Sequence, residues 1–114
     1  MKHPVEVYAK VFGCHIKTIL RAALNEPHPS DWHPDPIDHY KVAEAFNMNR
    51  NLLAACIDGK DTLIIVDDAA EKLGISIRRF HQRRAEDKAY APAAAHGRIV
   101  RYSLAAIENL RDGI

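Results

Sequence analysis

The fold is decided by one stretch, Ile65-Val-Asp-Asp-Ala-Ala-Glu-Lys-Leu-Gly-Ile-Ser-Ile-Arg-Arg-Phe-His-Gln-Arg-Arg84. It predicts a short helix, a tight turn at Gly74-Ile75 and a second helix rich in arginine. Asp67 and Asp68 suit the first turn of the first helix, where acidic side chains are favourable. Gly74 can take the left-handed conformation that ends a helix, and Ser76 is a good N-cap for the next one.

The second predicted helix has two different faces. Ile77 and Phe80 are three residues apart, so both are expected to face the core. Arg79, Gln82 and Arg83 share another face, at i, i+3 and i+4 spacing. A helix-turn-helix needs this layout, because one face holds the second helix on its core while the other presents long donors to a DNA groove.

The segment Val66-Asp-Asp-Ala-Ala-Glu-Lys-Leu-Gly-Ile-Ser-Ile-Arg-Arg79 resembles the winged helix-turn-helix of phage excisionases and of regulators with a mercury-resistance-type DNA-binding head. In that pattern an acidic pair precedes Ala-Ala, Leu-Gly ends the first helix, and Ser with basic residues opens the recognition helix. The resemblance implies a β-hairpin wing and a last helix. His96-Gly-Arg-Ile-Val-Arg-Tyr102 resembles the returning wing strand, and Ser103–Leu110 the last helix. Ile77 departs from the pattern, which usually has a polar or basic residue there.

Positive charge is concentrated in the same part of the chain, in the second predicted helix and the wing. The net charge of +1 is low for a nucleic-acid binder. Residues 76–101 nevertheless contain seven Lys/Arg and two Asp/Glu, a net of +5, whereas residues 1–61 contain seven and eight, a net of −1. Such a local concentration of positive charge is typical of a phosphate-binding face.

The first half of the chain is similar to the second, which indicates an internal repeat. The segment around Gly13 can be laid over the segment around Gly74 at a shift of 61. After a variable segment the match resumes at a shift of 62, where Tyr40 falls on Tyr102. The identities are few, so chance similarity is the alternative to duplication.

The expected fold is mainly α with short β wings, as a tandem winged helix-turn-helix. Residues 1–58 form the first repeat, with a Pro-rich loop and a long linking helix, and residues 59–114 form the winged second repeat. The turn Asp58-Gly-Lys-Asp61 marks the boundary.

Three connecting segments complete this layout. Residues 40–57 are consistent with one amphipathic helix that packs the repeats together or forms a dimer interface. Residues 62–66 are a β-branched run, expected to form a strand that pairs with the wing. Residues 25–38 contain four prolines, so we expect a rigid loop rather than a hairpin, with Trp32 as its anchor.

The first half has a weaker candidate recognition helix at residues 15–24. The segment Tyr8-Ala-Lys-Val-Phe-Gly-Cys-His-Ile-Lys-Thr-Ile19 also resembles the helix-turn-helix of lambda-type phage terminase small subunits, which carry Phe-Gly and Thr-Ile at these positions. The loop that follows is acidic and would be repelled by phosphate. The first half is therefore expected to bind DNA weakly or to contact protein.

The residues predicted to bind DNA are the basic and polar side chains of the two recognition helices and of the wing: Ser76, Arg78, Arg79, Gln82, Arg83, Arg84, His96, Arg98, Arg101, Lys17, Thr18 and Arg21. Arg79, Gln82 and Arg83 are the expected base readers, since Arg suits guanine and Gln suits adenine. The phosphate ligands are expected to be Arg78, Arg84, Arg98 and Arg101. A solvated helix face is the alternative for the helical arginines, and plain surface charge is the alternative for those of the wing.

The sequence favours no catalytic or metal site. The histidines and aspartates of residues 28–39 lack a compact His-x-x-x-His pair with further cysteine support, so no metal is predicted. No Gly-rich phosphate loop or Ser-His-Asp arrangement is present, so we expect no enzyme, no cofactor and no small-molecule substrate. Cys14 and Cys56 are expected to be buried thiols in a reducing cytoplasm, and no apolar run has the roughly 18 residues that span a membrane.

The expected function is sequence-specific binding of double-stranded DNA by a protein of phage or mobile-element type. It would act as a transcriptional regulator or recombination directionality factor in the cytoplasm or nucleoid of a bacterial host, with a homodimer or cooperative oligomer on DNA as an option. Two alternatives stay open. One is a DNA-packaging recognition protein like a terminase small subunit, and the other is a protein-interaction module such as an antirepressor or adaptor, which the near-neutral charge favours.

Overall fold

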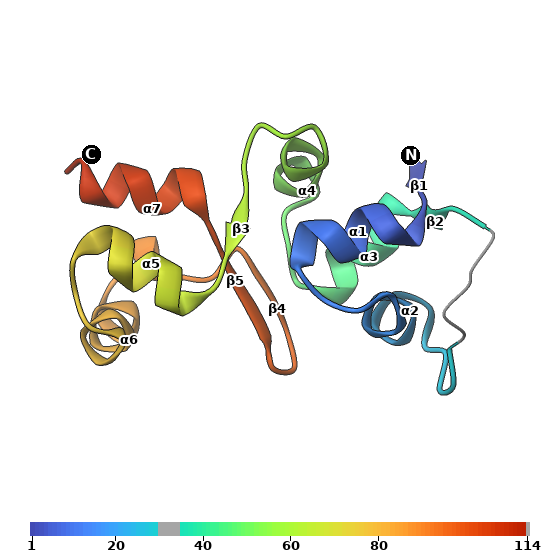
Figure 1. The fold of residues 1–114 in the computed structure, drawn as a ribbon, viewed down its shortest axis with the longest axis horizontal. Coiled ribbons are helices and arrows are strands. Elements are labelled where there is room, and N and C mark those ends of the chain that lie inside the picture. The colour runs from blue at the N-terminus through green and yellow to red at the C-terminus, as the bar shows by residue number, and fades with distance from the viewer. Residues whose placement is uncertain (30–34, 114) are drawn as a thin grey trace. The chain divides into compact units, whose positions relative to one another are not determined.

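The computed structural model describes residues 1–29 and 35–113 and divides the chain into two compact units, Met1–Lys60 (unit 1) and Asp61–Ile114 (unit 2) (Figure 1). Both units are mainly helical with small antiparallel sheets. The division lies two residues after the boundary expected from the sequence. None of the described helices combines the length and the apolar character needed to cross a membrane. Trp32, the expected loop anchor, lies outside the described residues.

The described part of unit 1 contains two short strands and four helices: β1 (Lys2–His3), α1 (Val5–Phe12), α2 (Ile16–Leu24), β2 (Ile37–Asp38), α3 (His39–Ala45) and α4 (Arg50–Ile57). β1 pairs antiparallel with β2. In the core the rings of Phe12 and Phe46 stack with their centroids 4.1 Å apart. The hydroxyl of Tyr8 donates a buried hydrogen bond of 2.9 Å to the carbonyl of Ile37, which ties α1 to β2.

The single helix expected over residues 40–57 is wrong, because α3 and α4 are separate helices. Asn47 has a left-handed backbone with a φ of 48°, which asparagine tolerates better than most residues. The side-chain oxygen of Asn49 then accepts hydrogen bonds from the N–H groups of Asn51 and Leu52, at 2.8 and 3.3 Å. Asparagine therefore both interrupts the expected helix and caps the next one.

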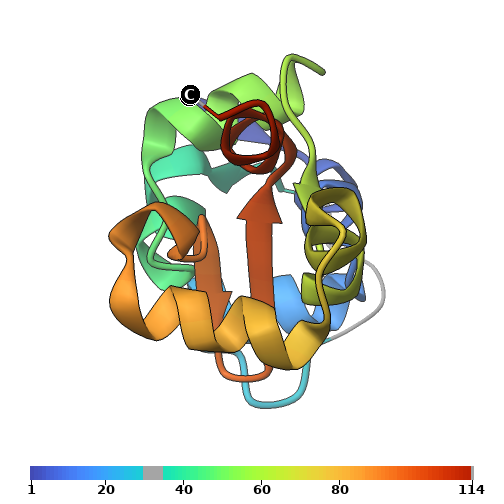
Figure 2. The same ribbon diagram turned by 90° about the vertical axis from the view of Figure 1, so that its left-hand side faces the viewer.

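Unit 2 begins with β3 (Leu63–Ile64), α5 (Val66–Leu73) and α6 (Ile77–Glu86), followed by a single 3-10 turn η1 (Lys88–Tyr90) and then by β4 (Ala94–His96), β5 (Ile99–Ser103) and α7 (Leu104–Arg111). β5 is the central strand of a sheet with the order β3-β5-β4. The expected pairing of the 62–66 run with the returning strand is confirmed, since Ile64 lies opposite Tyr102. β4 and β5 form a hairpin closed by Gly97-Arg98. Figure 2 shows α5, α6 and α7 grouped around β5.

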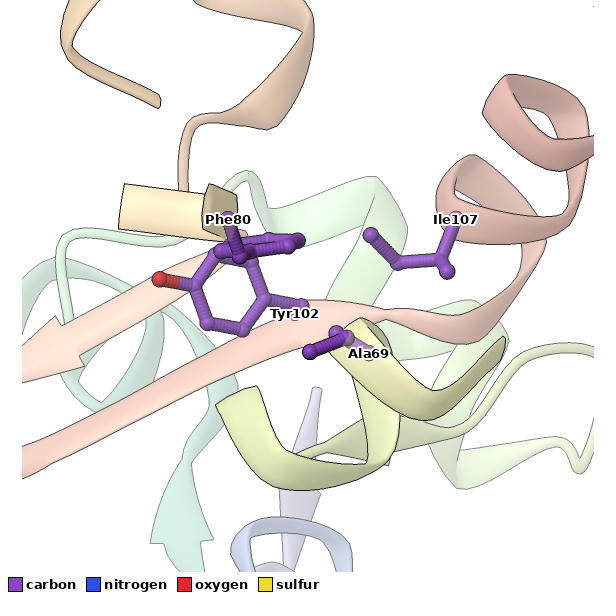
Figure 3. Close-up of a cluster of buried hydrophobic side chains, with 5 residues drawn as sticks. Ala69, Phe80, Tyr102 and Ile107 are labelled. Atoms are coloured by element: carbon purple, nitrogen blue, oxygen red, sulfur yellow. The ribbon is translucent and has the colours of Figure 1, made fainter. Parts of the chain in front are cut away.

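The core of unit 2 draws on both helices and sheet. Its buried members are Ala69 and Ala70 from α5, Phe80 from α6, Tyr102 from β5 and Ile107 from α7 (Figure 3). The Phe80 ring lies edge-on to Tyr102, with centroids 4.9 Å apart and an interplanar angle of 83°. It also lies edge-on to Tyr90, at 5.6 Å and 73°. One phenylalanine therefore fixes α6 against β5 and η1 through aromatic contacts.

Both units contain a strand, two helices joined by a turn, a strand that pairs with the first one, and a helix directly after it. Unit 2 has η1 and β4 in addition before its pairing strand, and unit 1 has α4 at its end. Their second parts do not correspond at the shift of 62 expected from the sequence. Asp38 and Ser103 are equivalent, because each ends the strand that pairs with the first strand and each caps the helix that follows, which gives a shift of 65. Tyr40 is 51% exposed and Tyr102 is 1% exposed, so these tyrosines are not counterparts.

Candidate nucleic-acid interface

The start of α6 is fixed by its own sequence. Gly74 ends α5 with a left-handed φ of 67°. The side-chain oxygen of Ser76 accepts a hydrogen bond of 3.1 Å from the N–H of Arg79. Both the glycine stop and the serine cap expected from the sequence are confirmed. They determine which residues of α6 stand in its first turn.

The side of α6 that faces away from the core carries Arg78, Arg79 and Gln82, which we call the outer face of α6. Successive helical residues are rotated by about 100°, so Arg78 and Gln82 lie about 160° from Phe80, and Arg79 about 100° from it. All three are exposed, whereas Phe80 is fully buried. The expected inward orientation of Ile77 is wrong, since its side chain is 41% exposed at the edge of the contact centred on Phe80.

Arg83 and Arg84 lie on the flanks of the same helix and are half-buried. Nη1 of Arg83 donates a hydrogen bond of 3.2 Å to the hydroxyl of Tyr90. Nη1 of Arg84 donates one of 3.0 Å to the hydroxyl of Tyr102. The face expected to join Arg83 with Arg79 and Gln82 is therefore only partly formed. No role for the tyrosines was expected, because the contacts depend on how η1 and β5 return to the helix.

The β4–β5 hairpin carries the second group of predicted residues. Arg98 is exposed in the two-residue turn beside Gly97, whose φ is 56°. His96 is exposed at the end of β4, opposite Ile99. Arg101 is half-buried, and its Nη1 donates to the neighbouring carbonyl of Val100 at 3.1 Å. The tip of the hairpin therefore presents Arg98 and His96 to solvent.

Positive charge is concentrated at the first turn of α6. Glu86, the carboxylate at the other end of the helix, lies about 12 Å along the axis from Arg78, which exceeds the screening length of about 8 Å at physiological salt. Among the described residues, no ion pair joins Arg78, Arg79 or Arg98 to a carboxylate. Arg78, Arg79 and Arg98 therefore keep their charge available to an anion.

Unit 1 has a partial counterpart of this surface on α2. At the shift of 61, Lys17, Thr18 and Arg21 occupy the positions of the outer face of α6. Arg21 is exposed and the other two are half-buried. The Nδ1 atom of His15 accepts from the N–H of Lys17 at 3.1 Å, in the place of the serine cap. Within residues 1–29 and 35–60 no hairpin follows α2. The strand after this helix, β2, pairs with β1, which precedes α1, and not with a neighbouring strand.

The histidines and aspartates near the Pro-rich loop do not assemble into a metal site in the described part of the chain, where no group of three or more metal-binding side chains is found. His39 is buried, with its Nε2 2.8 Å from the carbonyl oxygen of Arg50. His33 and Asp31 lie outside the described residues.

Comparisons with protein-family models, with curated proteins and with solved structures find no match for this chain. The resemblance to winged helix-turn-helix families therefore rests on the sequence motif alone.

Proposed function

We propose that this chain binds double-stranded DNA with sequence specificity and is a tandem winged helix-turn-helix protein in which unit 2 is the main reader. In this proposal α5 and α6 form the helix-turn-helix, α6 is the recognition helix, and the β4–β5 hairpin is the wing. Unit 1 repeats the helix-turn-helix with a weaker surface.

The observation that carries the proposal is the exposed outer face of α6, opposite the buried Phe80. A major groove about 12 Å wide admits one α-helix. The first turns of a recognition helix reach the base edges, and Arg78, Arg79 and Gln82 stand there. Arginine can donate two hydrogen bonds to guanine, and glutamine can make two hydrogen bonds with adenine, donating one to N7 and accepting one from the N6 amino group. Arg78 thereby takes the base-reading place that the sequence assigned to Arg83.

The hairpin supports a second contact, with the DNA backbone. Arg98 and His96 are exposed at its tip, and Arg101 lies half-buried on β5. Contacts to phosphate oxygens orient a protein on the duplex without reading its sequence. We assign this positioning role to the wing, with Arg98 as its principal ligand.

Unit 1 contributes a weaker contact in this proposal. Its surface on α2 offers Lys17, Thr18 and Arg21, of which only Arg21 is exposed. The net charge of residues 1–61 is −1, so long-range attraction to phosphate is small there. The loss of Lys17 and Arg21 should therefore cost less affinity than the loss of Arg78 and Arg79.

A DNA-binding protein of this kind can serve three biological processes. These are transcription control, directing of site-specific recombination, and marking of DNA for packaging, all of which suit a protein of phage or mobile-element type in the cytoplasm or nucleoid of a bacterial host. A homodimer or a cooperative oligomer on DNA would raise affinity for paired sites. The fold does not select one outcome.

A second candidate function is a protein-interaction module, and exposed apolar side chains favour it. Ile65 and Ile77 of unit 2 are 42% and 41% exposed. Exposed apolar groups next to a polar surface suit a protein partner. This candidate predicts that replacing Ile77 with lysine abolishes partner binding, whereas the DNA proposal predicts that the added charge does not weaken binding to DNA.

The test of the proposal is fluorescence anisotropy of the full chain with a labelled random-sequence duplex, over a series of salt concentrations. Each phosphate contact contributes about 0.9 to the log–log salt slope, so a slope of several units is expected. No binding at low salt would refute DNA binding. Unchanged affinity in the Arg78→Ala/Arg79→Ala variant would refute the role of α6.

A further inference from the structure

Arg84 is turned toward the hairpin rather than toward the outer face of α6. Arg84 lies about 40° around the helix from the buried Phe80, whereas Gln82, on the outer face, lies about 160° from Phe80. Its Nη1 donates a hydrogen bond of 3.0 Å to the hydroxyl of Tyr102, which is 18 residues further along the chain. Arg84 is half-buried, and one of its donors is already used within unit 2.

Tyr102 stands at the base of the hairpin. Its side chain is 1% exposed, and its ring lies edge-on to Phe80. Its strand, β5, pairs with β3 on one side and with β4 on the other. The aromatic ring is held by the core while the hydroxyl reaches Arg84, so this tyrosine joins the recognition helix to the wing.

The wing tip is sensitive to small rotations about this base. Arg98 lies four residues before Tyr102 on the returning strand, which is about 13 Å at the rise of an extended chain. A rotation of about 10° at the base displaces the tip by about 2 Å. Hydrogen bonds to phosphate oxygens need donor–acceptor distances near 2.9 Å, so a displacement of about 2 Å breaks them.

We propose that Arg84 and Tyr102 are positioning residues, whose hydrogen bond sets the wing relative to α6 so that Arg98 reaches a phosphate while the outer face occupies the groove. The inference rests on the proposed DNA binding. It replaces the role expected from the sequence, in which Arg84 itself holds a phosphate.

The arginine next to it provides a matched control. Arg83 donates a comparable bond, of 3.2 Å, to the hydroxyl of Tyr90. Tyr90 lies in η1, which belongs to neither strand of the hairpin. Tyr90→Phe therefore removes one hydroxyl bonded to one arginine of α6, as Tyr102→Phe does, but it leaves the base of the wing intact.

The experiment measures the affinity and salt slope of the full chain on one labelled duplex, with urea unfolding of each variant as a check on folding. Tyr102→Phe is expected to weaken binding about tenfold and Arg84→Met by the same factor, since each would cost the chain the charge-assisted bond between Arg98 and a phosphate. The double variant should lose no more than either alone, because both act through one bond. The salt slope should fall by about one unit in each, as one phosphate contact is lost.

Two further variants are measured, one that alters the wing and one that serves as the control. Arg98→Ala should lower the slope by about one unit, and adding Tyr102→Phe to it should cause no further loss. Tyr90→Phe should bind like the wild-type chain. If Tyr102→Phe unfolds, Arg84→Met added to Arg98→Ala tests the inference, because a positioning residue should cause no further loss once Arg98 is absent, whereas a direct phosphate ligand should. Arg84 is half-buried at the surface, so its replacement leaves the core of unit 2 in place.

The outcomes separate this inference from the proposed function. Weak binding by Arg84→Met with full binding by Tyr102→Phe would show that Arg84 holds a phosphate directly, and would overturn the positioning role alone. Equal losses in Tyr102→Phe and Tyr90→Phe would also overturn it. A wild-type chain that does not bind any duplex would overturn the proposed function and this inference together.

Discussion

Gly13 and Gly74 lie 61 positions apart and share a left-handed backbone, with φ values of 64° and 67°. Each ends the first helix of its unit, one turn before the helix that carries the polar face. Within residues 1–29 and 35–113, no atom beyond the chain neighbours lies within 4 Å of the place where a Cβ would stand at either glycine. Both positions therefore require glycine for its backbone freedom rather than for space.

Gly74→Ala should lower the free energy of unfolding of unit 2 by about 1 kcal/mol, because alanine is strained in the left-handed region. Urea-induced unfolding measures the change. Gly74→Asn is the control and should recover part of the loss, since asparagine visits this region more readily. Equal stability of the alanine variant and the wild-type chain would contradict the account of the turn.

Asp61→Ala should loosen the start of α7. The carboxylate accepts hydrogen bonds from the hydroxyl of Ser103, at 2.5 Å, and from the N–H of Ala105, at 3.1 Å. Loss of such a cap costs about 1 kcal/mol. Hydrogen exchange of the first amides of α7 should speed up about fivefold for each 1 kcal/mol lost, while Asp58→Ala, at an exposed position of unit 1, should leave them unchanged.

Phe80 and Ile77 should differ sharply in their effect on stability, although both are apolar residues of α6. Phe80→Ala removes a fully buried ring and should cost about 3–5 kcal/mol. Ile77→Lys changes a side chain that is 41% exposed and should alter stability by no more than about 0.5 kcal/mol. Thermal unfolding of both variants checks this, and a large loss in Ile77→Lys would place this residue in the core after all.

Unit 1 should lose stability at strongly alkaline pH through Tyr8. Burial raises the pKa of Tyr8 from 10.0 to about 12. Between these two values the unfolded chain releases a proton that the folded chain retains, so stability is full below pH 10 and falls by at most about 1.4 kcal/mol per pH unit as the pH rises toward the folded pKa. Tyr8→Phe also loses the bond to Ile37 but should remove this part of the pH dependence. An unchanged slope in the variant would contradict the assignment.

The features of unit 2 that depend on neighbouring residues were predictable from the sequence. The left-handed Gly74, the Ser76 cap and the strand Leu63–Ile64 within the 62–66 run each follow from chemistry within a few residues. Glycine in the left-handed region and serine at a helix start have strong local preferences that tertiary packing rarely reverses.

Features that depend on distant partners were missed. Asp38 and Ser103 are equivalent because of how their strands pair, not because their sequences are similar. The stretch of chain between the glycine that ends the first helix and this residue is longer in unit 2 than in unit 1, so an alignment of the two halves at a constant offset does not match the two residues. The half-burial of Arg84 requires the hydroxyl of Tyr102, which only the folded sheet brings close. The direction of Ile77 was misjudged because two apolar residues in one helix do not define where the centre of its buried face lies.

The central claim is that the outer face of α6 reads DNA, and a comparison of two double variants of equal charge tests it most directly. Arg78→Ala/Arg79→Ala removes two positive charges from that face, and Lys72→Ala/Arg111→Ala removes two from exposed positions on α5 and α7. Anisotropy on a duplex that the wild-type chain selects from a random-sequence pool should show a loss of about a hundredfold for the first pair and of less than about threefold for the second. Equal losses for the two pairs, or none for the first, would contradict the claim.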